Sequence, residues 1–289
     1  MTATDANDPQ DTQRKMGALT ESLQQMGSII VAYSGGVDSA FLAAAANQVL
    51  GERALAVTAD SPSLAPSELR DAVALAERVG LHHRVIRTQE VEREDYQANT
   101  PYRCFFCKDE LYTHLTAFAS TEGYAWVANG TNVDDLGDFR PGQNAAKEYG
   151  VISPLVDAGL TKAEIRQLSR DMGLPTWDKP AQACLSSRIP YGSRVTVEAL
   201  TRIAKAEEHL RSLGFRQLRV RHHDTVARIE IAPEDFAPLL TEDVRQNVAK
   251  YFRSIGYAYV TLDLDGFRSG SMNEVLGKNQ RTGEVQPSA

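Results

Sequence analysis

The stretch Ser28–Gly51, SIIVAYSGGVDSAFLAAAANQVLG, decides the fold of this 289-residue chain. Its apolar start predicts a buried strand, its paired glycines predict a turn, and the alanine-rich remainder predicts a helix that the final glycine ends. Two further apolar segments, 53–60 and 81–88, predict strands, with a helix expected between them over 61–80. The chain therefore begins as strands that alternate with helices.

The same alternation continues to about residue 175. A helix is predicted over 109–123, a strand over 124–132 and another helix over 161–175. This spacing predicts an α/β fold, with a parallel sheet that helices cover on both faces. Ligands of such sheets bind beyond the carboxyl ends of the strands, and the polar turns SGGVDS, ADSPS and NGTNVDD fall at those ends.

A second, smaller domain is predicted after residue 188, because the pattern changes there and the chain is longer than one core usually spans. Its predicted elements are a helix over 197–214, strands over 215–222 and 226–232, a helix over 233–256 and a strand over 257–264. This is a compact α+β pattern. We expect a disordered tail over 1–15, an α/β domain over 16–188 and an α+β domain over 189–289.

The composition is ordinary for a globular protein, with 42% apolar and 24% charged residues. Its longest apolar runs are too short to cross a bilayer, and the polar N-terminus lacks the apolar core of a signal peptide. Three cysteines without an export signal favour the reducing cytoplasm. The formal net charge of −7 argues against a broad nucleic-acid surface. We expect a cytoplasmic protein with no membrane or nucleic-acid partner.

The hexapeptide SGGVDS has the features of a phosphate-binding loop. Gly35 and Gly36 let the backbone curl so that its N–H groups face outward, and the following helix adds its positive N-terminus. Ser34 and Ser39 can donate hydroxyl hydrogen bonds to phosphate oxygens. Asp38 suits an anion site only if it holds Mg²⁺ that bridges the phosphates. The loop lacks the lysine of a Walker A motif, so γ-phosphate transfer is not expected.

The spacing of Cys104 and Cys107 is compatible with several kinds of site. The pair could serve redox chemistry, ligate a cluster, or form part of a zinc site completed by His82 or His114. The two phenylalanines between the thiols argue against a thioredoxin-like pair. The third cysteine, Cys184, has polar neighbours that favour a nucleophile with a lowered pKa over a small buried apolar residue.

The loop SGGVDS resembles, in full, the PP-loop of the ATP pyrophosphatases, which cleave ATP between the α- and β-phosphates and adenylate a substrate. In that family the adenine and ribose contacts lie in the turns that match TADSPS and NGTN, which implies that Ser61 and Gly130 bind ATP. A closer resemblance, over about residues 17–272, is to the LarE family of ATP-dependent sulfur transferases. It rests on SGGVDSAFL, RCFFCK, NGTNVDDLGDFRPG, GLPTWDKPAQACLSSRIPYG and GFRSGSMN.

The LarE resemblance implies a reaction in nickel-pincer nucleotide biosynthesis. ATP with Mg²⁺ adenylates a carboxylate of pyridinium-3,5-biscarboxylic acid mononucleotide, with Asp38 as the metal-holding residue, and sulfur then displaces AMP. In single-cysteine members, the cysteine matching Cys184 gives up its own sulfur and becomes dehydroalanine. In three-cysteine members, the cysteines matching Cys104, Cys107 and Cys184 hold a [4Fe–4S] cluster whose open iron binds an extra sulfide. The cysteine pattern favours the cluster, with sacrifice of Cys184 as the alternative.

Arg219 and Arg221 fall on one face of a predicted strand, where two guanidinium groups suit a phosphate. From periodicity alone, a solvated strand face is the alternative. The resemblance assigns both arginines to the substrate phosphate and places Ser187 and Arg188 in the same pocket. Glu230, on the paired strand, is expected to face one of the two strand arginines or to bind a metal.

Four further expectations concern the same domain and the assembly. Glu207 is expected to be solvated in mid-helix, and Arg268 is a candidate for closing the pocket. The pairs His82–His83 and His222–His223 are expected on strand surfaces. The resemblance implies a homo-oligomer, with a hexamer as the family's known form.

Three other functions are weighed against sulfur transfer to a small nucleotide. Cluster-dependent tRNA thiolation also uses PP-loops, but it needs a basic RNA-binding surface that the net acidity disfavours. A nucleotide-binding protein without catalysis is disfavoured by Asp38, Ser39 and Cys184. Amidation would need a source of ammonia, and no glutaminase portion is visible.

Overall fold

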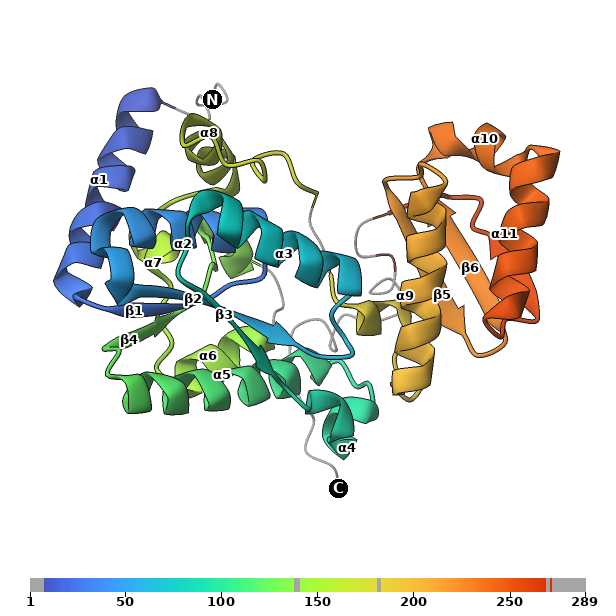
Figure 1. The fold of residues 1–289 in the computed structure, drawn as a ribbon, viewed down its shortest axis with the longest axis horizontal. Coiled ribbons are helices and arrows are strands. Elements are labelled where there is room, and N and C mark those ends of the chain that lie inside the picture. The colour runs from blue at the N-terminus through green and yellow to red at the C-terminus, as the bar shows by residue number, and fades with distance from the viewer. Residues whose placement is uncertain (1–7, 138–140, 181–182, 269–270, 272–289) are drawn as a thin grey trace. The chain divides into compact units, whose positions relative to one another are not determined.

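The computed structural model describes residues 8–137, 141–180, 183–268 and 271, and the chain divides into two compact units (Figure 1). Unit 1 comprises Met1–Ser61, Glu68–Gln89 and Cys104–Gln182. Unit 2 comprises Pro62–Ser67, Glu90–Arg103 and Ala183–Ala289. The segments Pro62–Ser67 and Glu90–Arg103 were predicted in the α/β domain but belong to unit 2. The chain enters unit 2 for the last time at Ala183, whereas the predicted boundary was after residue 188.

Unit 1 is built on a four-stranded parallel sheet with the order β3-β2-β1-β4. The strands are β1 (Ile29–Ala32), β2 (Ala54–Asp60), β3 (His83–Arg87) and β4 (Trp126–Ala128). All four lie within predicted strand segments, and their parallel pairing confirms the predicted α/β fold. Burial explains the apolar runs of the central strands, since β1 and most of β2 are buried under the helices of the two faces.

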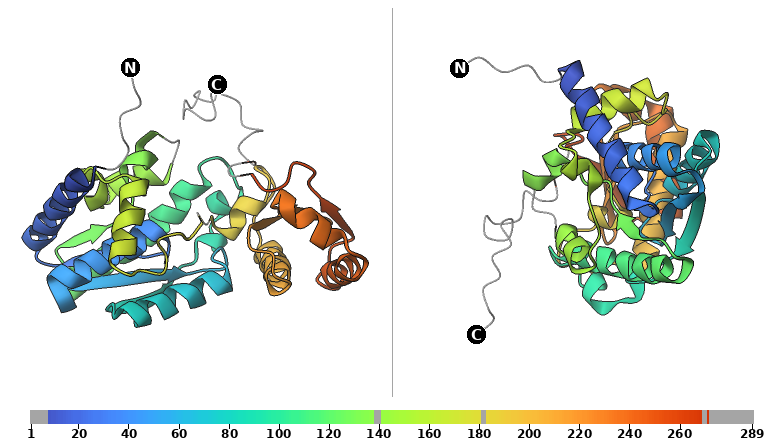
Figure 2. Two further views of the ribbon diagram at one scale, coloured as in Figure 1. Left: turned by 90° about the horizontal axis from the view of Figure 1, so that it is seen from above. Right: turned by 90° about the vertical axis from the view of Figure 1, so that its left-hand side faces the viewer.

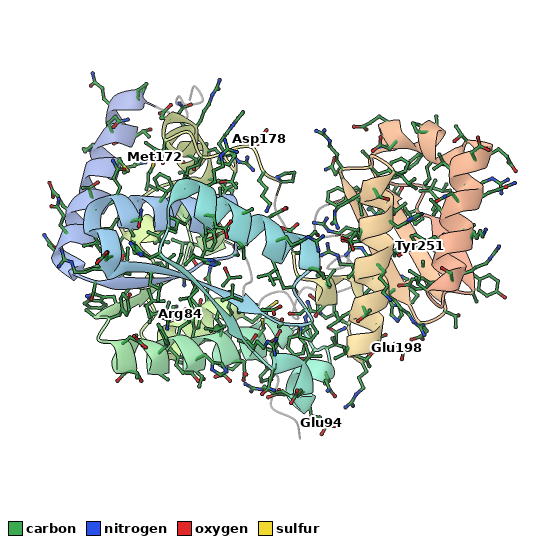
Figure 3. The ribbon with its side chains drawn as sticks, viewed as in Figure 1. Arg84, Glu94, Met172, Asp178, Glu198 and Tyr251 are labelled. Carbon is green, nitrogen blue, oxygen red and sulfur yellow. The ribbon has the colours of Figure 1, made fainter. Side chains whose placement is uncertain are left out.

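Helices cover both faces of this sheet (Figures 1 and 2). Ile29 and Val31 of β1 join a core with α1, α2, α3, α7 and α8, whereas the alternate residue Ile30 joins a core with α5 and α6. On the second face, the Arg84 guanidinium of β3 lies 4.8 Å from the ring centre of Phe118 of α5 (Figure 3). These helices are α1 (Pro9–Met26), α2 (Val37–Leu50), α3 (Pro66–Val79), α5 (Arg103–Glu122), α6 (Gly142–Glu148), α7 (Pro154–Asp157) and α8 (Lys162–Asp171), with the 3-10 helices η1 (Gly51–Arg53) and η3 (Val133–Gly137).

Two helices of unit 1 include residues that were not predicted to be helical. The first starts at Pro9, after the Asp8 carboxylate, which accepts a hydrogen bond from Gln10 N at 2.9 Å. Proline at the first helical position and aspartate before it are a helix start signal, so residues 9–15 are helical rather than part of a tail. The other, α5, starts at Arg103 and therefore includes both cysteines of the RCFFCK segment.

Unit 2 is built on a three-stranded mixed sheet with the order β5-β6-β7. Strands β5 (Leu218–His223) and β6 (Val226–Ile231) are antiparallel, and β7 (Tyr259–Leu262) runs parallel to β6. Apolar residues of β5 and β6 share a buried core with helices α9 and α11, where the rings of His209 and Tyr251 stack 3.9 Å apart (Figure 3). The helical segments are η2 (Glu90–Glu92), α4 (Glu94–Gln97), η4 (Leu185–Arg188), α9 (Val197–Ser212), η5 (Pro233–Asp235), α10 (Phe236–Leu240) and α11 (Glu242–Ser254).

The single helix predicted over 233–256 is interrupted. Pro238 lacks the N–H that an unbroken helix would bond to the residue four positions earlier, and Thr241 has extended backbone angles of φ −58° and ψ 147°. The segment therefore folds as η5, α10 and α11. Among the described residues, no helix combines the length and apolar character needed to span a bilayer.

Candidate functional site

The Ser34–Ser39 loop connects β1 to α2, as predicted. Gly35 has a φ of +69°, and a Cβ at this position would lie 2.8 Å from the Cβ of Ala72, so both the turn and its packing require glycine. Gly36 is the N-cap residue of α2 and has no side chain to satisfy the helix N–H groups. The hydroxyl oxygens of Ser34 and Ser39 lie 3.0 Å apart, and Ser39 Oγ accepts a hydrogen bond from Ser34 N at 3.1 Å. The loop has the glycine-dependent geometry of an anion-binding turn.

Asp38, in the first turn of α2, contacts two groups from distant segments. Asn132 Nδ2 donates to its Oδ1 at 3.2 Å, and the Lys162 ammonium forms an ion pair with its Oδ2. Lys162 is the first residue of α8 and remains partly exposed. This lysine supplies the positive charge that the loop itself lacks.

Sequence reasoning missed Lys162, although a signal for its position existed. Thr161 and Glu164 form a capping box at the start of α8, in which the Thr161 hydroxyl accepts from Glu164 N and the Glu164 carboxylate accepts from Thr161 N. The spacing T-x-x-E in the sequence marks this helix start. Because the helix begins after the fourth strand of the α/β pattern, its first residue is a candidate for the same edge of the sheet.

Gly130 lies against the first turn of α2. A Cβ at this position would lie 2.8 Å from Ser39 N and 3.1 Å from Asp38 C, so the NGTN turn approaches the loop at backbone distance. The predicted site residue Ser61 follows the last residue of β2 directly. The structure thus places Gly130 and Asn132 beside the loop, and direct contact of Ser61 or Gly130 with ATP stays a prediction.

A second lysine missed from the sequence, Lys179, supports the loop. Its Nζ donates to Gly35 O at 3.3 Å and pairs with Glu68 Oε2 at 3.1 Å. Arg166 of α8 fixes the same segment by donating to Trp177 O at 2.7 Å and to Lys179 O at 2.9 Å. Helix α8 therefore carries Lys162 and also anchors the segment that contacts the glycine turn.

Cys104 and Cys107 lie in the first turn and a half of α5, three residues apart and so on neighbouring positions of one helix face. Cys104 is exposed, Cys107 is half-buried, and no disulfide joins the three cysteines, all of which are described. His114, the candidate zinc ligand, lies 3.2 Å from Glu110 on the same helix. Within the described residues, no three His, Cys, Asp or Glu side chains gather as a metal site.

Cys184 belongs to unit 2, whereas Cys104 and Cys107 belong to unit 1. It is the N-cap residue of η4 and is half-buried. The donor set fits an iron–sulfur cluster in chemical type, since three thiols are the ligands such clusters use. Because the set is divided between the two units, the cluster stays a prediction.

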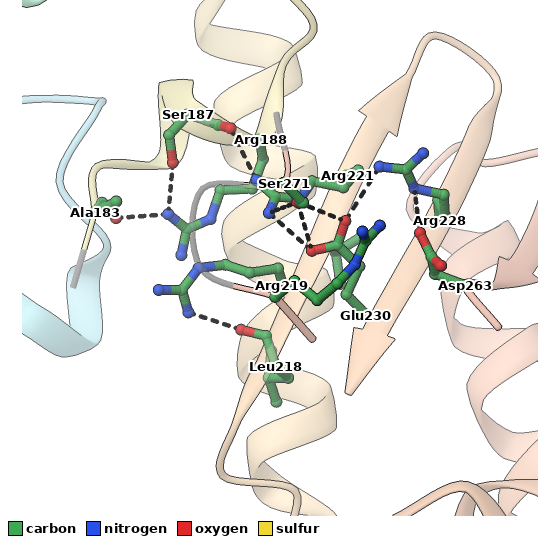
Figure 4. A network of polar contacts seen from close by, with 12 residues as sticks. Ala183, Ser187, Arg188, Leu218, Arg219, Arg221, Arg228, Glu230, Asp263 and Ser271 are labelled. Carbon is green, nitrogen blue, oxygen red and sulfur yellow. Dashed lines mark hydrogen bonds and ion pairs between the residues drawn. The ribbon is translucent and has the colours of Figure 1, made fainter. Parts of the chain in front are cut away.

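The predicted substrate arginines of unit 2 make internal contacts (Figure 4). Arg188 is 1% exposed and pairs with Glu207, which is fully buried, so the expectation of a solvated Glu207 was wrong. Arg221 donates to Glu230 Oε2 at 2.7 Å, which confirms that Glu230 faces a strand arginine. Arg219 donates to Leu218 O at 2.8 Å and lies over the ring of Phe267.

Positive charge is concentrated around Arg219. Burial, and then the charge of Arg188, lower the pKa of Arg219 to about 10, and Arg221 and Arg211 act in the same direction. Glu207 opposes this effect. A half-buried guanidinium crowded by other arginines is a favourable place for an anion. Arg268 pairs with Asp265 at 3.3 Å, and its predicted role in closing the pocket is untested.

The histidine pairs divide between surface and core. His82 is exposed, whereas His83 Nε2 lies 2.8 Å from the Thr58 hydroxyl. His222 is 8% exposed and its Nδ1 lies 3.1 Å from Tyr257 Oη, so the expected surface position of this residue was wrong. In β5, alternate residues point to the helix-covered face, and His222 shares that face with Leu218 and Val220.

Comparisons with known proteins show several relatives of this chain. The family model described as NAD synthase matches residues 12–106. An uncharacterized protein of Synechocystis is 47% identical over 264 residues, which cover 91% of this chain and 98% of that protein. The pyridinium-3,5-bisthiocarboxylic acid mononucleotide synthase of Lactiplantibacillus plantarum is 37% identical over 267 residues, which cover 92% of this chain and 96% of that protein. The tRNA-specific 2-thiouridylase MnmA of Rickettsia felis is 28% identical over 192 residues, which cover 54% of this chain and 53% of that protein.

Proposed function

Because the chain belongs to the LarE-like family of PP-loop ATP pyrophosphatases, we propose that it transfers sulfur to pyridinium-3,5-biscarboxylic acid mononucleotide in nickel-pincer nucleotide synthesis. The observation that carries the proposal is the match to the Lactiplantibacillus plantarum synthase, which extends over 92% of this chain and both units. The glycine turn with its two lysines supports the ATP half of the reaction.

The first half-reaction is adenylation. A carboxylate oxygen of the substrate attacks the α-phosphorus of ATP, the bond to the bridging oxygen breaks, and pyrophosphate leaves. We expect the N–H groups of the Ser34–Ser39 loop and the Lys162 ammonium, which contacts Asp38, to neutralise phosphate charge. Mg²⁺ is expected on Asp38, since this metal is often held by one carboxylate together with substrate phosphates. Lys162 would then exchange the Asp38 carboxylate for a phosphate oxygen.

In the second half-reaction a sulfur nucleophile attacks the acyl-adenylate carbonyl, and AMP leaves with the bonding electrons. Cys104, Cys107 and Cys184 would hold a [4Fe–4S] cluster, which when bound offers one iron for a transferable sulfide. The alternative source is Cys184 itself. In that case its Cβ–S bond breaks after acyl transfer, loss of the α-proton leaves dehydroalanine, and each chain reacts once.

Arg219 and Arg221 of β5 are the proposed anchor for the substrate phosphate. Arg219 is the strongest candidate, because it is half-buried and the nearby charge of Arg188 adds to burial in lowering its pKa. The predicted homo-oligomer also belongs to this proposal, and light scattering after size-exclusion chromatography tests it.

Transfer of sulfur to tRNA is the second candidate, which the resemblance to MnmA favours. That resemblance covers 54% of this chain, and the formal net charge of −7 opposes a broad tRNA surface. Retention of tRNA that weakens steeply with salt would support this candidate over the small nucleotide.

The decisive experiment supplies ATP, Mg²⁺ and the mononucleotide to protein purified without oxygen, and measures pyrophosphate and thiocarboxylate. Formation of both supports the proposal, whereas pyrophosphate release with tRNA alone would overturn it. Iron and acid-labile sulfide per chain then identify the sulfur source. About four irons, lost in Cys104→Ala, indicate the cluster. Absence of iron, with dehydroalanine found by mass spectrometry at position 184, indicates sacrifice.

A further inference from the structure

Arg188 is bound on both sides by groups of the protein itself. Its Nε and Nη2 donate to the two Glu207 oxygens at 2.9 and 3.1 Å, which is the bidentate arrangement of a strong arginine–carboxylate pair. Its remaining nitrogen, Nη1, donates to Ala183 O, to Cys184 O at 2.9 Å and to Ser187 Oγ at 2.9 Å (Figure 4). The guanidinium thus joins the turn that contains Cys184 to the helix that carries Glu207.

The Glu207 carboxylate is a fixed anchor. It is fully buried in α9, and it also accepts hydrogen bonds from Val220 N of β5 at 3.1 Å and from Arg211 Nη2 at 3.0 Å. Burial by itself would raise the pKa of Glu207, but the charge and hydrogen bonds of Arg188, together with Arg211, hold that pKa below its ordinary value. The carboxylate is therefore ionised and connects a helix, a strand and the turn.

The turn itself is held at several points. The Cys184 carbonyl accepts from Ser187 N at 3.0 Å, from Ser187 Oγ at 2.7 Å and from Arg188. At the other end of the turn, Arg221 Nη1 donates to Ser187 O at 3.0 Å, while its Nη2 pairs with the buried Glu230. Two buried arginine–glutamate pairs thus fix the main chain on both sides of the cysteine.

We propose that Arg188 is a positioning residue for the Cys184 sulfur, acting through its pair with Glu207, rather than a ligand of the substrate phosphate. The proposal rests on the proposed sulfur transfer, and it applies whether Cys184 gives up its own sulfur or ligates a cluster. All nitrogens of this guanidinium already have protein acceptors, and the side chain is 2% exposed. Sulfur attack on an acyl-adenylate needs a defined direction, and a displacement of about 1 Å can slow such a step by about a hundredfold.

The main test compares two double variants, each of which removes an ion pair that involves a glutamate of α9. Arg188→Met with Glu207→Met removes the buried pair, and replacement of a buried ion pair by apolar residues of similar size usually preserves folding. The matched control, Arg202→Gln with Glu198→Gln, removes an ion pair of 2.5 Å on the same helix, in which Glu198 is 74% exposed (Figure 3). We expect the thiocarboxylate formed per pyrophosphate to fall by about tenfold to a hundredfold in the first variant. In the control variant, the thiocarboxylate formed per pyrophosphate should equal that of the wild type.

A second measurement separates positioning from substrate binding. If Arg188 positions the sulfur, Arg188→Lys lowers the same ratio, because one ammonium cannot serve both Glu207 and the three acceptors of the turn. Arg219→Gln should instead raise KM for the mononucleotide and keep the ratio. A raised KM with an unchanged ratio in Arg188→Lys would overturn the proposal.

A third measurement does not depend on sulfur transfer, and so distinguishes failure of this proposal from failure of the proposed function. In the full chain with Cys104→Ser and Cys107→Ser, only Cys184 can be alkylated. Loss of the Arg188–Glu207 pair should raise the rate of this alkylation at a fixed pH, because the half-buried thiol is released with its turn. An alkylation rate identical to that of the Arg202–Glu198 control would contradict the positioning role even if no substrate were turned over.

Discussion

The ammonium group of Lys162 pairs with the Asp38 carboxylate, although the two residues are 124 positions apart in the chain. Asp38 occupies the first turn of α2 and Lys162 the first position of α8. The pair brings a cation to a glycine loop that has none of its own. Because both side chains remain partly exposed, an incoming nucleotide can exchange one partner for another.

Removal of the Lys162 charge should weaken the ATP half-reaction. We expect Lys162→Ala to lower the rate of pyrophosphate release by about tenfold to a hundredfold, because one preorganised cation at the phosphates is lost. Steady-state pyrophosphate release at several ATP concentrations measures the effect. Lys147→Ala, which removes an exposed lysine of α6, is the control. Equal rates in both variants would exclude Lys162 from the phosphate site.

Gly130→Ala should disturb the loop through packing alone. The added methyl group would lie 2.8 Å from Ser39 N, a backbone atom that cannot move without shifting α2. We expect a loss of about 1–3 kcal/mol in the free energy of unfolding, as for other overpacked sites, together with weaker ATP binding. Denaturant titration and ATP-binding calorimetry measure the two effects.

The control for this change is Gly137→Ala. Within the described part of the chain, and apart from the neighbouring residues, no atom lies within 4 Å of a Cβ built at Gly137, and the residue is exposed at the end of η3. We expect its unfolding free energy to stay within about 0.5 kcal/mol of the wild type. A similar loss in both variants would mean that close packing does not explain the glycine at position 130.

Loss of the α8 cap should destabilise unit 1. Thr161→Ala removes the hydroxyl that accepts from Glu164 N, and the expected cost is about 1 kcal/mol in the free energy of unfolding. Thr121→Ala is the matched control, since the Thr121 hydroxyl only donates to Ala117 O inside α5. Chemical denaturation compares the variants, and an equal effect of the two changes would contradict a capping role.

Acidification should destabilise the fold before its carboxylates titrate. Burial lowers the pKa of His222 below its usual value near 6.5, and burial does the same for His83 and His223. The unfolded chain then binds protons that the folded chain does not, so the free energy of unfolding falls as the pH drops below about 6.5. Above that pH the contribution of the neutral histidines to stability is complete.

Urea titrations at a series of pH values between about 5 and 8 measure this slope. His222→Gln should make the slope shallower, because the side chain that resists protonation is removed. His114→Gln, at an exposed position of α5, is the control. If the dependence of unfolding free energy on pH is as steep in His222→Gln as in the wild type, His222 does not contribute to it.

Much of unit 1 could be predicted from local sequence. The strands of its sheet fall inside the predicted segments. For β1 and β2 the reason is that a strand buried on both faces must be apolar along most of its length. The start of α1 was missed, since the signal at Asp8 and Pro9 is short and lies in a polar segment. The break at Thr241 was missed although Pro238, three residues earlier, is a signal for it, because proline cannot supply the N–H of a continuous helix.

The partners of charged residues could not be predicted in this way. Glu207 lies in the middle of an amphipathic helix, where a glutamate is usually solvated. The approach of Arg188, Arg211 and the Val220 N–H explains its burial. His222 was expected at the surface because the sequence does not show which face of β5 the helices cover.

The sequence by itself determined the parallel sheet, the position of the phosphate loop and the family, because glycine turns, apolar runs and residue order are local properties of the chain. Which charges meet follows only from the three-dimensional packing. Asp38 with Lys162, Glu68 with Lys179, and Arg188 with Glu207 are pairs from different segments of the chain. Their contacts depend on the packing of strands and helices in three dimensions, and a charged side chain carries no local mark of the partner that it will find.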